Sequence, residues 1–157
     1  MKQLANTVVK KLVKKKINIS FAESCTGGML SSSITSISGS SRVFALCLIS
    51  YSDSSKIDLL KIPKRMISKY GAVSQQVCAA MVKNVNKIGK TKMSASITGV
   101  AGPKGGTKKK PVGLVYIGIK KGHKISVKKY HFKNKGRLYI QKTSVTKCLK
   151  LILSFLK

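Results

Sequence analysis

Segments with a helical repeat of apolar residues alternate along this chain with short apolar runs, and this order constrains the fold more than any other feature. Apolar residues at helical spacing, with lysines between them, predict an amphipathic helix over residues 2–16. Residues 17–22 alternate between apolar and polar, which predicts a strand. Residues 44–51 are nearly all apolar, a pattern typical of a strand that is buried on both faces.

The same alternation continues to the end of the sequence. Further helices are predicted near residues 28–36, 54–60, 63–70, 74–88 and 136–156, and further strands over 94–98, 113–120 and 124–132. Lys121-Gly122 joins the last two strands as a hairpin, which makes the sheet mixed. No internal repeat and no long linker divides the chain. We therefore predict a single α/β domain over residues 1–157, a three-layer α/β/α sandwich.

Length and hydropathy agree with a folded domain. The chain has 157 residues, of which 43% are hydrophobic, so a buried core is expected. No apolar run approaches the roughly 20 residues that span a bilayer. Lysines interrupt the first residues too early for a secretory signal peptide. We expect a cytoplasmic protein that does not enter membranes.

The four cysteines, Cys25, Cys47, Cys78 and Cys148, do not form a metal-binding pattern. None belongs to a CxxC pair, and no histidine stands beside them at ligand spacing. For Cys47, Cys78 and Cys148 we favour reduced thiols on core faces. No metal and no cofactor is expected.

The formal charge of +29, from 32 basic and 3 acidic residues, suggests a nucleic-acid partner. However, only Arg42, Arg65 and Arg137 are arginines, and arginine reads bases and phosphates better than lysine does. The lysines are spread from end to end, without a nucleic-acid-binding motif. We therefore expect only non-specific contact with nucleic acid, although a basic accessory protein stays open as an alternative.

The segment Ala22–Gly28 reads as a strand, a turn and the start of a helix. A side chain at such a turn projects from the carboxyl end of a strand, where open α/β sheets bind ligands. The following helix is expected to offer free N–H groups and a positive dipole end to an anion. Ser24 and Cys25 are both candidate nucleophiles; alternatively, Ser24 or Thr26 is only a helix cap.

Two further segments carry candidate residues. Tyr51 closes the apolar run and Lys56 follows in the next predicted helix, and a neutral lysine with a tyrosine relay is able to activate a serine. The glycine-rich loop Gly99–Gly113 is able to wrap a phosphate or a sugar with backbone N–H groups. Taken singly, however, one lysine in a lysine-rich chain and one long surface loop are explained equally well without any function.

Taken together, these segments resemble the C-terminal domain of the CinA (competence/damage-inducible) family, whose stand-alone members include nicotinamide-nucleotide amidase. The matching motifs are Ala22-Glu-Ser-Cys-Thr-Gly-Gly28, Ser38-Gly-Ser-Ser41, Tyr51-Ser52 with Lys56, Gly71-Ala-Val-Ser74, Thr98-Gly-Val-Ala-Gly-Pro103 with Gly105-Gly106-Thr107, and Lys110-Pro-Val-Gly113. Their order and spacing also fit, so the resemblance covers nearly the whole chain.

The resemblance implies hydrolysis of nicotinamide mononucleotide to nicotinate mononucleotide and ammonia, by a homodimer that uses no metal. It assigns the nucleophile to Ser24, the base to Lys56 and an assisting role to Tyr51. The expected substrate-binding residues are Thr26, Gly27, Gly28, Thr98, Gly99, Gly102, Gly105, Gly106, Thr107 and Arg137. We expect the oxyanion to be held by backbone N–H groups around Thr26 and Gly27.

The chain departs from the family pattern at a few positions. Cys47 stands where glycine is usual, and Gln141 stands where a second arginine is common. Lys104, Lys108 and Lys109 replace residues that are often acidic or neutral. These changes leave Ser24, Tyr51 and Lys56 intact. A catalytically silent CinA-like binding or regulatory protein is the alternative to the enzyme.

Overall fold

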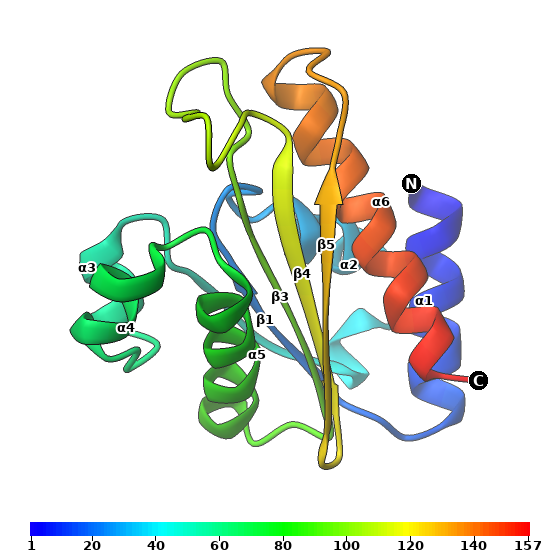
Figure 1. The fold of residues 1–157 in the computed structure, drawn as a ribbon. Helices are drawn as coiled ribbons and strands as arrows, with labels where there is room; N and C mark the ends of the chain where they lie inside the picture. Colours follow the sequence, from blue (N-terminus) through cyan, green and yellow to red (C-terminus); the bar gives the residue numbers. More distant parts are fainter.

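A mixed five-stranded sheet with strand order β2-β1-β3-β4-β5 forms the middle layer of the computed structural model, which describes residues 1–157 (Figure 1). The strands are β1 (Ile19–Glu23), β2 (Phe44–Ile49), β3 (Met93–Gly99), β4 (Leu114–Lys121) and β5 (Lys124–His131). Strand β1 pairs in parallel with β2 and β3, whereas β4 runs antiparallel to both β3 and β5. The predicted α/β sandwich with a mixed sheet is confirmed.

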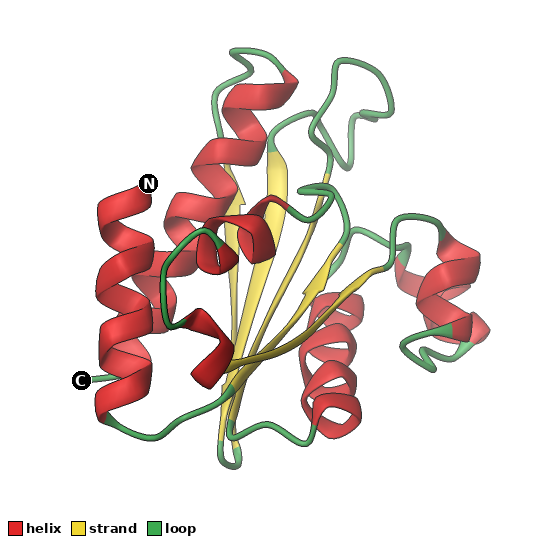
Figure 2. Ribbon diagram, turned by 180° about the vertical axis from the view of Figure 1, so that it is seen from behind, coloured by secondary structure: helices red, strands yellow, loops and turns green.

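Helices cover both faces of this sheet (Figures 1 and 2). Helices α1 (Lys2–Lys14), α2 (Met29–Thr35) and α6 (Arg137–Phe155) pack on one face over the larger apolar cluster. Helix α5 (Gln75–Gly89) covers the other face over a smaller cluster. The short helices α3 (Asp53–Asp58) and α4 (Lys64–Tyr70) extend this second layer outward, and η1 (Ser40–Arg42) is a single 3-10 turn. None of these helices has the length and apolar character to cross a bilayer.

Strand β2 differs from its prediction. The apolar run was expected to be buried on both faces, but β2 is an edge strand whose residues are half-buried or exposed. Ile49, at its end, keeps 48% of its surface exposed. The strands buried on both faces are β1, where all five residues are buried, and β3, where six of seven are. An apolar run predicts a strand, but not how many neighbours that strand acquires.

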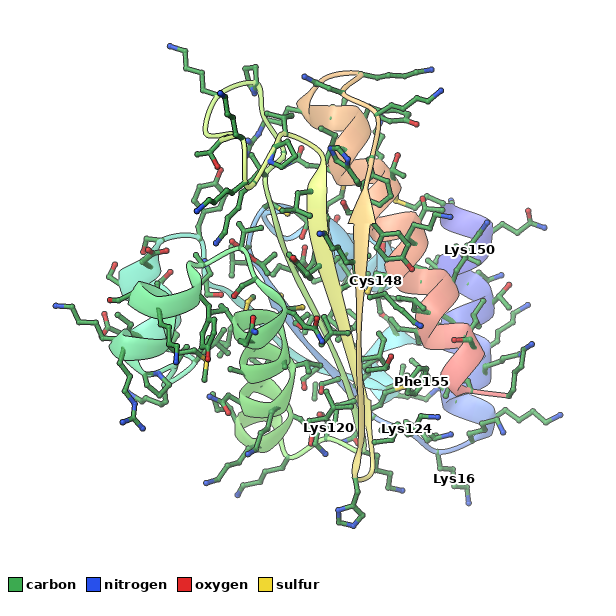
Figure 3. All side chains as sticks on the ribbon, viewed as in Figure 1. Lys16, Lys120, Lys124, Cys148, Lys150 and Phe155 are labelled. Atoms are coloured by element: carbon green, nitrogen blue, oxygen red, sulfur yellow. The ribbon has the colours of Figure 1, made fainter.

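The parallel strands β1, β2 and β3 all end at the same edge of the sheet, so the segments that follow them meet there (Figure 1). The labelled side chains of Lys16, Lys120 and Lys124 lie near the opposite end (Figure 3). Long side chains point outward on all sides of the molecule in that view. The lysine excess is thus a property of the whole surface and does not mark one strand edge or one helix.

Hydroxyl groups fasten α5 to the sheet. Ser94 and Ser96, on one face of β3, donate hydrogen bonds to the α5 carbonyls of Val82 and Cys78 at 2.8 and 2.9 Å. Those carbonyls have a second lone pair beyond the one used within the helix. Gly118 of β4 lies directly opposite Ser96, and a Cβ there would meet Ser96 Oγ at 2.6 Å. The missing side chain lets α5 and its hydroxyl partners approach the sheet closely.

A double-mutant cycle tests this contact. Gly118→Ala should lower the free energy of unfolding by about 1–3 kcal/mol, because the added methyl overlaps Ser96 Oγ. Ser96→Ala should cost about 1 kcal/mol by losing one buried hydrogen bond. The double variant should lose clearly less than the sum, since the clash partner is gone. Additive losses in urea unfolding would show that Ser96 Oγ does not set the spacing.

Candidate active site

Ser24 and Lys56 meet at the carboxyl edge of the sheet, although they come from different elements. Ser24 follows the last residue of β1, and its N–H donates to the Ile97 carbonyl of β3 at 3.0 Å. Lys56 lies on α3, the helix after β2, and its Nζ is 3.1 Å from Ser24 Oγ. Helix α3 begins where the Ser52 hydroxyl caps the N–H of Ser55. The contact joins the two residues directly, without an intervening side chain.

Lys56 is the only buried lysine of the chain, with 1% of its surface exposed. Its Nζ donates to the carbonyls of Ser50 at 2.8 Å, Tyr51 at 3.3 Å and Ser52 at 3.5 Å. Burial lowers the pKa of the Lys56 ammonium below its ordinary value of 10.5, and nearby Asp53 opposes this shift. Burial thus favours the neutral form, which has a lone pair to accept a proton from the Ser24 hydroxyl.

The phenol of Tyr51 is hydrogen-bonded to Arg137 and not to Ser24 or Lys56. Its side chain is 58% exposed, and its hydroxyl accepts a 2.6 Å hydrogen bond from Arg137 Nη2. Arg137, the first residue of α6, also donates through Nη1 to the Gly102 carbonyl at 3.0 Å. Tyr51 contacts Lys56 through its backbone carbonyl only. The expected relay through the phenol thus has no hydrogen-bonded path in this structure.

A pocket of about 260 Å³ opens beside Ser24 and Lys56. Most of the predicted site residues line it: Ser24, Tyr51, Lys56, Thr98, Gly99, Gly102, Gly105 and Arg137. The predicted residues Thr26, Gly27, Gly28, Gly106 and Thr107 do not. Asp53 and Lys104 line the pocket without having been assigned to the site. The glycine-rich loop therefore forms one wall of the pocket through its first half.

The start of α2 is closed to an outside anion, contrary to the sequence-based expectation. Glu23, a fully buried residue, places its carboxylate there. It accepts hydrogen bonds from the backbone N–H groups of Gly28, Leu30 and Ser31 at 2.8–3.1 Å. The Thr26 hydroxyl donates to the same carboxylate at 2.6 Å. The residue just before the nucleophile thus occupies the helix end that we expected a ligand to use.

The turn after Ser24 leaves two other amides free. The Gly27 N–H donates to the Ser24 carbonyl at 3.0 Å, so it is not available to an oxyanion. The backbone N–H groups of Cys25 and Thr26, in the two peptide units that follow Ser24, donate to no other residue. Of these two residues only Cys25 lines the pocket. The Cys25 amide therefore replaces the amides around Thr26 and Gly27 as the candidate for an oxyanion hole.

Cys25 is an inert thiol in this environment. It is 5% exposed and belongs to the larger apolar cluster. Burial raises the pKa of its thiol to about 12, an effect that Arg137 and Lys56 only partly offset. Burial likewise raises the pKa of the Cys78 thiol to about 12, and no group of three or more cysteine, histidine or acidic side chains is arranged to hold a metal ion. The structure favours Ser24 over Cys25 as the nucleophile.

Sequence reasoning missed two residues that shape the turn. Glu23 was included in the first motif but received no role, and Gln141 was noted only as a departure. Gln141 of α6 donates through Nε2 to the Cys25 carbonyl at 2.8 Å. No local pattern signals a contact between residues 116 positions apart.

Comparisons with known proteins agree with this fold. The family model for the CinA C-terminal domain matches residues 1–156. A CinA-like protein of Prochlorococcus marinus subsp. pastoris is 49% identical over 148 residues, which cover 93% of this chain and 34% of that protein. The chain belongs to the CinA family. It spans about a third of the length of the curated CinA relatives that it matches.

Solved CinA structures superpose on nearly the whole chain. The competence/damage-inducible protein CihA of Agrobacterium tumefaciens has a TM-score of 0.97 at 29% identity, covering 99% of this chain and 95% of its own. A CinA superfamily protein of Escherichia coli has a TM-score of 0.94 at 24% identity, covering 98% and 89%. The first supports the family assignment, and the second shows the shared fold.

The lowered pKa of Lys56 predicts how the stability of this CinA domain varies with pH. Between the depressed pKa and 10.5, the unfolded chain binds a proton at Lys56 that the folded chain lacks. The free energy of unfolding should therefore rise with pH across this window and fall as the pH drops through it. Lys56→Met should remove this contribution. Denaturant unfolding of the wild type and Lys56→Met at several pH values measures this contribution as the difference between their free energies of unfolding. A difference that does not change with pH would contradict a lowered pKa for Lys56.

Proposed function

We propose that this CinA domain is an amidohydrolase that deamidates nicotinamide mononucleotide. The observation that carries the proposal is the 3.1 Å contact between Ser24 Oγ and a buried lysine whose pKa is lowered. A hydroxyl beside a neutral amine is an activated nucleophile. Membership in a family that includes amidases supports the choice of a carboxamide as the group attacked.

The first half of the reaction acylates the enzyme. Ser24 Oγ attacks the carboxamide carbon, and its proton passes to the lone pair of Lys56 Nζ. The carbonyl oxygen becomes an oxyanion, which the N–H group of Cys25 stabilises. Lys56 returns the proton to the departing nitrogen, the C–N bond breaks, and ammonia leaves with an acyl-serine behind it.

The second half reverses the same steps with water. A water molecule loses a proton to Lys56 while its oxygen bonds to the acyl carbon. The bond to Ser24 Oγ then breaks, and Lys56 returns the proton to that oxygen. The product is a carboxylic acid, which ionises at neutral pH. Tyr51 serves this sequence through its backbone carbonyl, which orients Lys56, and through its phenol, which positions Arg137.

The pocket wall suits an anionic group on the substrate. Arg137 and Lys104 line it together with the first half of the glycine-rich loop, opposite a single acid, Asp53. A planar guanidinium is well matched to phosphate oxygens. We assign the phosphate of the nucleotide to Arg137 and Lys104. The homodimer and the non-specific contact with nucleic acid stay predictions.

Release of ammonia from nicotinamide mononucleotide tests the proposal. The wild type should release it, and Ser24→Ala should reduce turnover by at least about a thousandfold. Cys25→Ala should keep most of the turnover, because burial raises the pKa of the Cys25 thiol and disfavours the thiolate. The rate should rise with pH through the lowered pKa of Lys56, because the neutral amine is the active form.

Two outcomes would contradict the proposal. Lys56→Arg keeps the charge but not the base, since arginine stays protonated, so near-normal turnover would mean that Lys56 is not the base. Calorimetric binding of the nucleotide by the wild type without ammonia release would favour the catalytically silent alternative.

Arg137→Met should separate binding from chemistry. It removes the guanidinium that contacts Tyr51 and Gly102 but leaves Ser24 and Lys56 in place. We expect KM for the nucleotide to rise about tenfold or more, with a smaller change in kcat, because the phosphate contact is made in both the ground and transition states. Steady-state kinetics measures both constants. An unchanged KM would remove Arg137 from the phosphate site.

A further inference from the structure

Asp53 is the one acidic residue that lines the pocket beside Ser24 and Lys56. The whole chain has only three acids. Glu23 is hydrogen-bonded to the start of α2, and Asp58 does not line the pocket. We propose that Asp53 is a specificity-determining residue that binds the positively charged pyridinium ring of the substrate. The inference rests on the proposed deamidation of nicotinamide mononucleotide and gives a role to an acid that this reaction leaves unused.

The substrate carries charges of both signs. Its phosphate is an anion, whereas its ring nitrogen is positive because it is bonded to the ribose as well as to two ring carbons. Three bonds separate that nitrogen from the carboxamide carbon, so the cation comes close to Ser24 Oγ when this carbon is attacked. A pocket that matches the molecule therefore needs an anion near the reacting groups in addition to cations for the phosphate.

The charged residues of the pocket have this arrangement. Asp53 precedes Lys56 by three residues on α3, which places the two side chains on the same face of the helix. The carboxylate is close enough to Lys56 to oppose the fall in the pKa of that amine. Arg137 and Lys104, which we assign to the phosphate, come from α6 and the glycine-rich loop. The acid thus accompanies the reacting groups, and the two cations come from other elements.

The uncharged part of the lining suits a flat ring. It includes four small apolar residues from two loops, namely Ala72, Val73, Val100 and Ala101. Apolar walls provide contact area but no compensating charge, and a cation that leaves water is costly without a partner. The Asp53 carboxylate supplies that partner. It should therefore favour a cationic ring over a neutral ring of the same shape.

Asp53 also has an ordinary structural role. It lies in the first turn of α3, where the helix dipole favours an acid. This role affects the stability of the helix and does not depend on the charge of a ligand. Two ligands that differ only in ring charge therefore separate the structural role from the proposed one.

The test uses the nucleotide and its benzamide analogue, in which a neutral benzene ring bonded to the ribose through carbon replaces the pyridinium. Calorimetry with Ser24→Ala measures binding of both without turnover. We expect the nucleotide to bind about fivefold more tightly than the analogue, a modest preference because Asp53 is exposed and its charge is partly screened. Adding Asp53→Asn should reduce this preference to less than about twofold.

Two further variants serve as controls in the same Ser24→Ala background. Asp53→Glu keeps the charge and should retain most of the preference. Asp58→Asn is the matched control, because it removes the same charge from an exposed position of the same helix outside the pocket lining. The preference should be unchanged in this variant.

The outcomes discriminate between the inference and the proposed reaction. An equal affinity for the two nucleotides before Asp53 is changed, a preference that survives Asp53→Asn, or one that Asp58→Asn removes as well would overturn the inference, even if the wild type releases ammonia. A preference that depends on Asp53 in a protein that releases no ammonia would support the inference and overturn the reaction. Failure of Ser24→Ala to bind either nucleotide, together with a wild type that releases no ammonia, would overturn both.

Discussion

The buried carboxylate of Glu23 is the interaction on which the local architecture of the site depends. An ionised carboxylate removed from water is costly unless hydrogen bonds replace its hydration. Here three backbone N–H groups of the α2 start and the Thr26 hydroxyl provide that replacement. Satisfying this one group fixes the angle between β1 and α2 and the path of the turn between them. The position of Ser24 is therefore set by the solvation of its neighbour rather than by contacts of its own side chain.

Charge and burial together explain why one lysine in a lysine-rich chain is special. The surface lysines stay in water, where their charges are solvated and screened over about 8 Å at physiological salt. Lys56 has lost that water, and its Nζ instead contacts the carbonyls of Ser50, Tyr51 and Ser52 together with Ser24 Oγ. Its pKa is lowered mainly by burial, so the surrounding positive charge of the protein is not needed to make it a base. The net charge of +29 acts on a different scale, by attracting anions to the whole surface.

The sequence predicted most of the secondary structure because helices and strands in this chain have distinct periods and clear ends. It did not predict features that depend on contacts between residues distant in the sequence. The apolar run that became β2 looks the same whether it lies at the centre or the edge of a sheet, and pairing alone decided that it is an edge strand.

Ser24 and Lys56 were found because a family resemblance joined two motifs that are separately unremarkable. Glu23 and Gln141 were missed because their roles arise from contacts with backbone groups, which leave no residue pattern. The free helix end was predicted wrongly for the same reason, since the occupant is the residue just before the turn.

The choice of serine over cysteine at adjacent positions follows from the same turn. Successive side chains leaving a strand point to opposite sides. Both residues line the pocket, but the Ser24 hydroxyl contacts Lys56, whereas Cys25 also belongs to the larger apolar cluster. Burial raises the pKa of the Cys25 thiol to about 12, which disfavours the reactive thiolate at neutral pH. Its backbone, by contrast, is fully used: the carbonyl binds Gln141 and the N–H lacks a protein acceptor. In the proposed mechanism, position 25 therefore serves the site through its peptide groups, and Ser24 is the nucleophile.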